Sequence, residues 1–89
     1  MLLAVYGTLR RGECNHHELN GARFMGEAFI GGYVVDNRMH LRTPVDRDWP
    51  TLIELYEVSD FTELDAFEAP DYVRTRVRLL DGRRVWAYL

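Results

Sequence analysis

The sequence is poor in the residues on which several common chemistries depend. Cysteine occurs once, at Cys14, so the chain cannot form an internal disulfide, and a structural zinc site of the usual cysteine-rich kind is not expected. Serine also occurs once, at Ser59, where a helix cap is needed, and no Gly-x-Ser-x-Gly motif is present. Nucleophilic serine chemistry is therefore poorly supported, and carboxylates become the main candidates for catalysis.

Long hydrophobic runs and a strong excess of one charge are also missing. No apolar run approaches the length of a membrane span, and residues 1–6 carry neither a basic leader nor a cleavage pattern, so we expect a cytoplasmic protein. The 11 basic and 14 acidic residues give a net charge of −3, and nucleic-acid binding would therefore need a local basic face. The remaining composition is that of a folded protein, and 89 residues predict one domain over residues 1–89.

The pattern of apolar, polar and turn-forming residues predicts a small α+β fold. Mostly antiparallel connections and glycine corners predict a mixed sheet that curls into a small β-barrel, with short helices covering its openings. The Asp81 and Gly82 pair predicts a type I′ hairpin turn. The predicted order begins with a strand over 1–6, a short helix from the Asn15 cap to Gly21, and two short strands within 22–36 with a bulge or tight corner between them. At most a short strand within 39–41 follows, and then a strand over 51–58. A helix from the Asp60 capping box, which Pro70 ends near Phe67 or Glu68, and a hairpin over 72–89 complete the chain.

A polar, glycine-containing stretch follows the first predicted strand. Gly7 and Thr8 interrupt the apolar run, and Gly12 closes the turn, so several backbone N–H groups can converge on one point and bind a carboxylate or an oxyanion. Such a stretch is equally compatible with a plain connection between two elements. It is not a phosphate-binding loop, because Glu13 and Cys14 stand where that motif needs a lysine and a hydroxyl.

One carboxylate stands in an unusual setting. Glu68 ends the second predicted helix between Phe67 and Ala69, and apolar neighbours and the negative end of the helix dipole both raise a carboxyl pKa. A raised pKa moves the group towards the range of a useful general base. The alternative is a surface glutamate in a helix-ending turn.

Three further groups invite functional hypotheses. His16 and His17 are adjacent and so point apart on a helix, which favours surface or packing roles over metal binding. Cys14 beside them could act as a nucleophile, although sequence neighbours seldom reach the required geometry. RNA or single-strand binding by a basic and aromatic hairpin face also stays open; this face would comprise Tyr72, Arg74, Arg76, Arg78, Arg83, Arg84, Trp86 and Tyr88.

Taken together, short motifs along nearly the whole chain resemble the gamma-glutamylcyclotransferase family, an AIG2-like group. The motifs are specific as an ordered set, though not singly. They are Tyr6-Gly7-Thr8-Leu9-Arg10 with Gly12 and Asn15, Gly21-Ala22-Arg23-Phe24, Glu54-Leu55-Tyr56-Glu57-Val58, Leu64-Asp65-x-Phe67-Glu68, and Tyr72-x-Arg74. The resemblance implies a small mixed α/β barrel.

The resemblance also implies a mechanism. Backbone N–H groups of Gly7, Thr8 and Leu9 would grip a gamma-glutamyl group, and Glu68 would take a proton from the substrate's α-amine as it attacks the γ-carbonyl. The ring closes to 5-oxoproline, and the same glutamate protonates the departing amine, with no metal or cofactor.

The resemblance extends to the rest of the pocket and to the partners. Tyr6 and Tyr72 would line the pocket, and Arg10 would support the loop or meet a substrate acid. The expected partner is a small gamma-glutamyl substrate, with neither nucleic acid nor membrane, and a homodimer stays open.

Three departures from the family pattern favour an alternative. Ala69 stands where the family usually has glycine, so a positive φ at that position would be strained. The region 37–51 is shorter than in typical members, and the chain stops where many continue. The alternative function is a catalytically weak or silent module that binds a gamma-glutamyl or other small acidic ligand in the same pocket.

Overall fold

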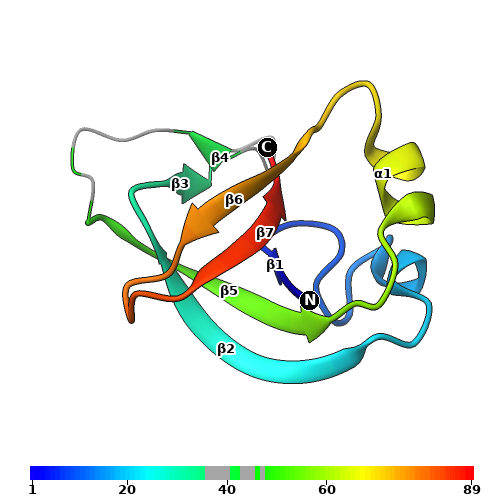
Figure 1. Ribbon diagram of the computed structural model, residues 1–89, viewed down its shortest axis with the longest axis horizontal. Coiled ribbons are helices and arrows are strands. Elements are labelled where there is room, and N and C mark those ends of the chain that lie inside the picture. Colours follow the sequence, from blue (N-terminus) through cyan, green and yellow to red (C-terminus); the bar gives the residue numbers. More distant parts are fainter. Residues whose placement is uncertain (36–40, 43–45, 47) are drawn as a thin grey trace.

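The computed structural model describes residues 1–35, 41–42, 46 and 48–89, and its centre is a five-stranded mixed sheet (Figure 1). The strand order is β2-β5-β1-β7-β6, in which β1 runs parallel to β7 and the other neighbours are antiparallel. The bounds are Leu2–Val5 for β1, Arg23–Gly31 for β2, Pro50–Glu57 for β5, Arg74–Arg78 for β6 and Arg84–Tyr88 for β7. A separate pair joins β3 (Val34–Val35) to β4 (Leu41–Arg42).

The sheet curls until its two outer strands meet at one point. An isolated antiparallel bridge joins Ile30 at the end of β2 to Leu79 just after β6, and both side chains are fully buried. Gly26 has a φ of 110° where the β2–β5 register shifts, and such a bulge increases strand twist. The predicted curled, mixed α+β sheet is confirmed, although only this bridge joins its outer strands in the described residues.

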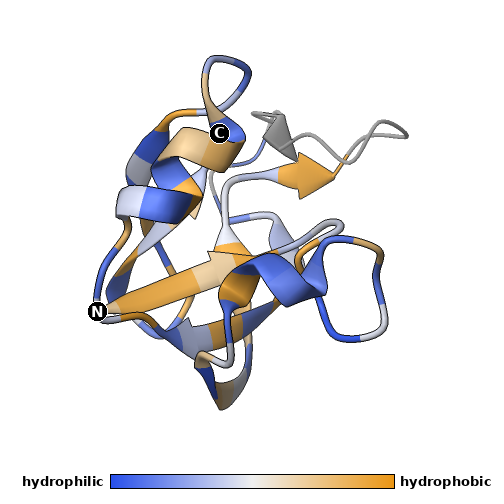
Figure 2. Cartoon of the chain, turned by 90° about the vertical axis from the view of Figure 1, so that its right-hand side faces the viewer, coloured by the Kyte–Doolittle hydropathy of each residue, from blue (hydrophilic) through white to orange (hydrophobic). Residues whose placement is uncertain are grey.

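The central strands carry buried side chains on both faces. Figure 2 shows β1, which begins beside the N-terminus, coloured as hydrophobic. On β1, Leu3 and Val5 belong to one cluster and Ala4 to the other, as expected for side chains that alternate along a strand. The first cluster also holds Tyr56, together with Leu19 and Leu64 from the two helical segments and Phe61, which directly precedes the second of them. The second is built from the sheet alone and holds Tyr6, Ile30, Ile53, Leu55, Val77, Leu79, Val85 and Ala87.

Two short helical segments cover the first cluster. The 3₁₀ helix η1 spans His16–Leu19 and buries Leu19, while α1 spans Thr62–Glu68 and buries Leu64. The predicted end of the second helix before Pro70 and the predicted strand over 51–58 are both confirmed. Among the described residues, no helix is long and apolar enough to cross a membrane.

Some local predictions were wrong for identifiable reasons. Residues 22–35 do form two strands, β2 and β3, with a turn between them at Gly32, where φ is 86°, but the first strand is not short, because β2 continues through the bulge for nine residues. The Asn15 side chain does not cap η1; it donates to Thr8 instead, and Asn20 ends the helix with a φ of 51°. The prediction for 39–41 lies outside the described residues except at Leu41, which begins β4.

The hairpin turn also differs from the prediction. A type I′ turn needs positive φ at both central residues, but within this turn only Gly82 has a positive φ, of 95°. The Gly82 N–H donates to the Leu79 carbonyl at 3.0 Å, and the Leu79 N–H donates to Arg83 at 2.8 Å. This is the pattern of a three-residue loop closed by a glycine bulge.

Candidate active site

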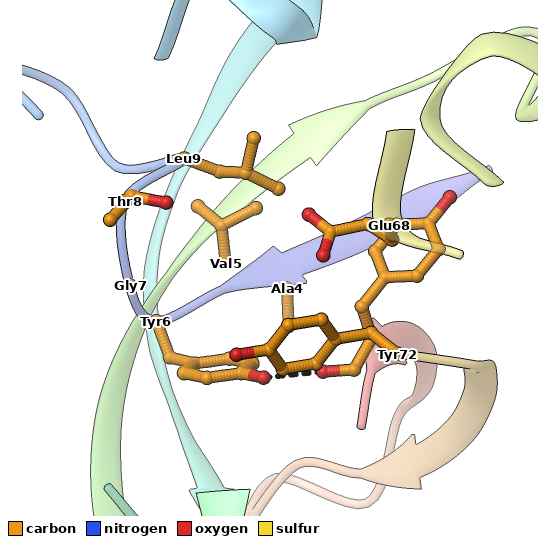
Figure 3. Close-up of a pocket in the computed structure, with 9 residues that line it drawn as sticks. Ala4, Val5, Tyr6, Gly7, Thr8, Leu9, Glu68 and Tyr72 are labelled. Atoms are coloured by element: carbon orange, nitrogen blue, oxygen red, sulfur yellow. Dashed lines mark hydrogen bonds between the residues drawn. The ribbon is translucent and has the colours of Figure 1, made fainter. Parts of the chain in front are cut away.

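A pocket of about 150 Å³ lies where β1 runs into the following loop (Figure 3). The loop and the end of α1 face each other across it, so segments about 60 residues apart in sequence share one site. Among the described residues that line the pocket, Glu68 carries the only carboxylate side chain and none is cationic. The lining consists of Ala4, Val5, Tyr6, Gly7, Thr8, Leu9, Glu68, Tyr72 and Tyr88.

The loop after β1 has its carbonyl groups engaged by the chain that follows it. The Gly7 carbonyl accepts from the Arg10 N–H at 3.1 Å, the Thr8 carbonyl from the Asn15 N–H at 3.0 Å, and the Leu9 carbonyl from the His16 ring at 2.8 Å. The amide N–H groups of Gly7, Thr8 and Leu9 have no acceptor among residues 1–35, 41–42, 46 and 48–89. Within the described part of the chain, three backbone donors of one loop therefore remain available to an anionic or carbonyl ligand.

Arg10 braces this loop. Its Nε donates to the Gly7 carbonyl at 3.1 Å, and its Nη2 lies 3.1 Å from the Glu13 carboxylate. It does not belong to the pocket lining. The sequence left two roles open for Arg10, support of the loop or contact with an acidic group of the substrate. This geometry matches support of the loop.

Glu68 is the last residue of α1 and is half-buried. Its carboxylate points towards the loop side of the pocket in Figure 3. Desolvation raises the pKa of Glu68 above its ordinary value, and the negative charge of Asp71 raises it further. The carboxyl thus combines a position in the pocket with a shifted proton affinity, which is the combination expected of a general acid or base.

Three tyrosines complete the pocket. The Tyr6 hydroxyl donates to the main-chain carbonyl of Tyr88, which ties the end of β1 to β7 (Figure 3). Tyr72 follows α1, and its N–H donates to the Glu68 carbonyl at 3.0 Å. Tyr88 was not among the site residues predicted from the sequence, which marked it only as an aromatic of the hairpin. Its place in the lining depends on the parallel pairing of β7 with β1, for which the sequence carries no local signal.

The strain expected at Ala69 is absent. Ala69 has φ of −71° and ψ of 148°, an ordinary extended conformation, and the following bond to Pro70 is cis. An alanine therefore fits this position without a positive φ. The shortened region 37–51 lies partly outside the described residues.

The remaining candidates are not brought into the pocket. Cys14 is exposed, His17 lies 3.2 Å from Glu18, and no cluster of three metal-ligating side chains occurs in the described part of the chain. Most arginines of the hairpin contact acidic or aromatic side chains of the protein itself. Arg74 pairs with Asp65, Arg76 lies over Trp86, Arg78 pairs with Asp48, and Arg83 pairs with Asp81.

Comparison with known proteins identifies the family of this chain. Residues 3–89 match the family model described as gamma-glutamyl cyclotransferase, AIG2-like. The chain belongs to this family. The match contains both the loop after β1 and Glu68, so the candidate site lies inside the family domain.

One relative of this chain is a curated protein of known sequence. A Pyrococcus horikoshii protein, PH0828, named as a candidate gamma-glutamylcyclotransferase, is 42% identical over 60 residues, which are 67% of this chain and 51% of that protein. The chain thus matches about half the length of this curated relative.

Solved structures extend the comparison to the fold. The crystal structure of PH0828 has a TM-score of 0.69 at 30% identity, with 99% of this chain and 75% of that chain covered. YkqA from Bacillus subtilis has a TM-score of 0.84 at 26% identity, covering 99% and 35%. Kluyveromyces lactis allophanate hydrolase shares the fold alone, with a TM-score of 0.80 at 20% identity, covering 99% and 17%.

Proposed function

We propose that this protein is a gamma-glutamyl cyclotransferase that releases 5-oxoproline and an amine from a gamma-glutamyl amine, amino acid or peptide. The observation that carries the proposal is the meeting of two groups at one pocket: the available N–H donors of residues 7–9 and the carboxylate of Glu68. Family membership supports the reaction class. No metal or cofactor enters the proposed reaction.

The proposed chemistry needs only one substrate molecule. Its α-amine nitrogen attacks its own γ-carbonyl carbon, forming the ring C–N bond, and the bond from that carbon to the departing nitrogen then breaks. Glu68 accepts the proton that the α-amine loses and delivers it to the departing nitrogen, so the reaction is balanced without water. Because nucleophile and electrophile belong to one molecule, the pocket lowers the barrier mainly by holding a folded conformation.

The loop supplies the electrostatic part of the mechanism. The γ-carbonyl oxygen becomes negatively charged as the α-amine adds, and the substrate also carries an α-carboxylate. Backbone donors fixed in advance stabilise such charges without reorganising during the reaction. We assign this function to the N–H groups of Gly7, Thr8 and Leu9, with Tyr6 and Tyr72 enclosing the substrate's carbon chain.

A panel of gamma-glutamyl amines, amino acids and peptides tests the proposal directly. We expect at least one substrate to yield 5-oxoproline and the free amine in equal amounts. Glu68→Gln should lower kcat by roughly 10²- to 10⁴-fold, the usual contribution of general acid–base catalysis. The matched control is Glu63→Gln, the same change at an exposed position of the same helix, which should leave kcat unchanged.

Binding measurements separate turnover from simple binding. Calorimetry should detect 5-oxoproline binding to both the wild type and Glu68→Gln, because the loop donors are intact in each. Binding without release of 5-oxoproline from any panel member would instead establish the alternative, a module that holds a gamma-glutamyl ligand without turning it over.

A further inference from the structure

A second cluster of polar side chains lies beside the pocket and joins three separate elements. Asp65 belongs to α1, Arg74 to β6 and Tyr88 to β7. The Tyr88 hydroxyl donates to Asp65 Oδ1 at 2.7 Å, and the Arg74 guanidinium donates through Nε at 3.0 Å and Nη2 at 3.3 Å to the two carboxylate oxygens. Both oxygens of Asp65 are therefore fixed by groups of the sheet.

The sheet holds the two donors in place. Arg74 and Tyr88 are direct cross-strand partners in the β6–β7 register, so their side chains leave the sheet on the same face. The Arg74 guanidinium also contacts two aromatic rings, with its central carbon 4.4 Å from the Phe61 centroid and 4.5 Å from the Trp86 centroid. Tyr88 is 4% exposed, and its carbonyl accepts the Tyr6 hydroxyl. Few rotamers remain open to either donor.

The helix that bears Glu68 needs such an anchor. α1 is seven residues long, and an isolated helix of that length is not stable in water. Within α1 only Leu64 is buried, one turn before the end of the helix. Asp65 and Glu68 are three residues apart and so lie on neighbouring positions of one helix face. Fixing Asp65 therefore fixes the direction in which Glu68 leaves the helix.

Backbone contacts carry this restraint to Glu68. The Ala69 N–H donates to the Asp65 carbonyl at 3.0 Å, and the Tyr72 N–H donates to the Glu68 carbonyl at 3.0 Å. Tyr88 also lines the same pocket as Glu68. A single helical turn therefore connects Asp65 to Glu68, and hydrogen bonds hold this turn at both of its ends.

We propose that Asp65, held by the Tyr88 hydroxyl and the Arg74 guanidinium, is the positioning residue that sets the Glu68 carboxylate in the pocket. The inference rests on the proposed function, in which Glu68 moves protons. Asp65 itself does not line the pocket. Its effect on turnover is exerted through the placement of Glu68.

Tyr88→Phe tests this role with the smallest change, because it removes one hydroxyl and keeps the buried ring. A displacement of about 1 Å at a catalytic group costs up to about 10²-fold in rate, so we expect kcat to fall roughly 10- to 100-fold with KM within about twofold. Tyr56→Phe is the matched control: it removes another tyrosine hydroxyl, bonded to Glu54 at 2.9 Å on β5, and should leave kcat unchanged.

Two substitutions at Asp65 extend the test. Asp65→Asn keeps an acceptor for the Tyr88 hydroxyl, whereas Asp65→Ala removes both oxygens. We expect the loss in kcat to be larger for alanine than for asparagine, with the affinity for 5-oxoproline unchanged in both. A merely structural role would instead lower the fraction of folded protein, which circular dichroism of each variant measures.

Amide hydrogen exchange across α1 keeps the inference separate from the proposed function. In Tyr88→Phe, exchange at residues 66–69 should accelerate about tenfold while exchange in β1 and β5 stays unchanged. If no substrate is turned over by the wild type, the proposed function fails, and this exchange result still decides whether the network holds α1. Unchanged exchange, an unchanged kcat, or a rise in KM alone would each overturn the positioning role.

Discussion

The proton affinity of Glu68 links its environment to a measurable pH dependence. Burial and the charge of Asp71 both disfavour the ionised form, so the pKa of Glu68 lies above that of a free glutamate. A general base acts only when deprotonated. We therefore expect kcat/KM to fall on acidification with a midpoint above the ordinary glutamate value of about 4.3. A kcat/KM profile from about pH 4 to 9 measures it. A midpoint at or below 4.3 would contradict the predicted environment.

The raised pKa of Glu68 also predicts how the stability of the fold changes with pH. Because the folded state binds this proton more tightly than the unfolded chain, the stabilisation from Glu68 is fully present at low pH. It is lost as pH rises through the folded-state pKa. Glu68→Gln should therefore gain stability relative to the wild type on going from acidic to neutral pH. Urea denaturation at several pH values measures the free energy of unfolding of both proteins. A difference between the two free energies that does not change with pH would contradict this prediction.

The sequence predicted some of the site residues and missed others. Gly7, Thr8, Leu9 and Glu68 stand in short motifs, so the sequence alone placed them in one hypothesis, and the structure brings them to one pocket. The partners of Asp65 could not be found that way. Arg74 and Tyr88 lie 9 and 23 residues further along the chain, and only the strand register brings both to one carboxylate.

At the scale of elements, the loop after β1 owes its shape to contacts with the segment that follows it. Asn15 contributes two of them, a main-chain N–H to the Thr8 carbonyl and a side-chain Nδ2 to Thr8 Oγ1, each at 3.0 Å. The sequence pattern predicted a helix cap at Asn15 because asparagine is a common N-cap. In the structure the Asn15 side chain donates to Thr8 and accepts no helical N–H, which the local pattern alone does not reveal.

Removing the Asn15 side chain should weaken substrate binding. Asn15→Ala deletes a hydrogen bond of about 1 kcal/mol and frees the Thr8 side of the loop, so we expect KM to rise several-fold with kcat little changed. Steady-state kinetics separates the two constants. Asn20→Gly is a suitable control, since it changes an asparagine of the adjacent turn whose positive φ glycine accepts. A fall in kcat at unchanged KM would show that the loop acts on the reaction step instead.

At the scale of the whole molecule, the curled sheet brings the pocket components together. β1 occupies the centre of the sheet, its side chains are buried on both faces, and the loop at its end meets α1 from the far part of the chain. The sequence predicted the strands, the second helix and the curl, because alternation and glycine corners are local signals. It did not predict the order of the strands, which depends on long-range pairing.

Closure of the sheet at the Ile30–Leu79 bridge supplies the last prediction. Leu79 is fully buried where the outer strands meet, whereas its neighbour Leu80 is 40% exposed. Leu79→Ala should lower the free energy of unfolding by about 2–5 kcal/mol, since it leaves a cavity in a packed core, and Leu80→Ala should lower it by less than about 1 kcal/mol. Urea denaturation followed by tryptophan fluorescence measures both. Equal losses in the free energy of unfolding at the two positions would mean that the Ile30–Leu79 bridge does not stabilise the curled sheet. A large loss confined to Leu79→Ala would show that the meeting of β2 and β6 stabilises the curled sheet on which the pocket is built.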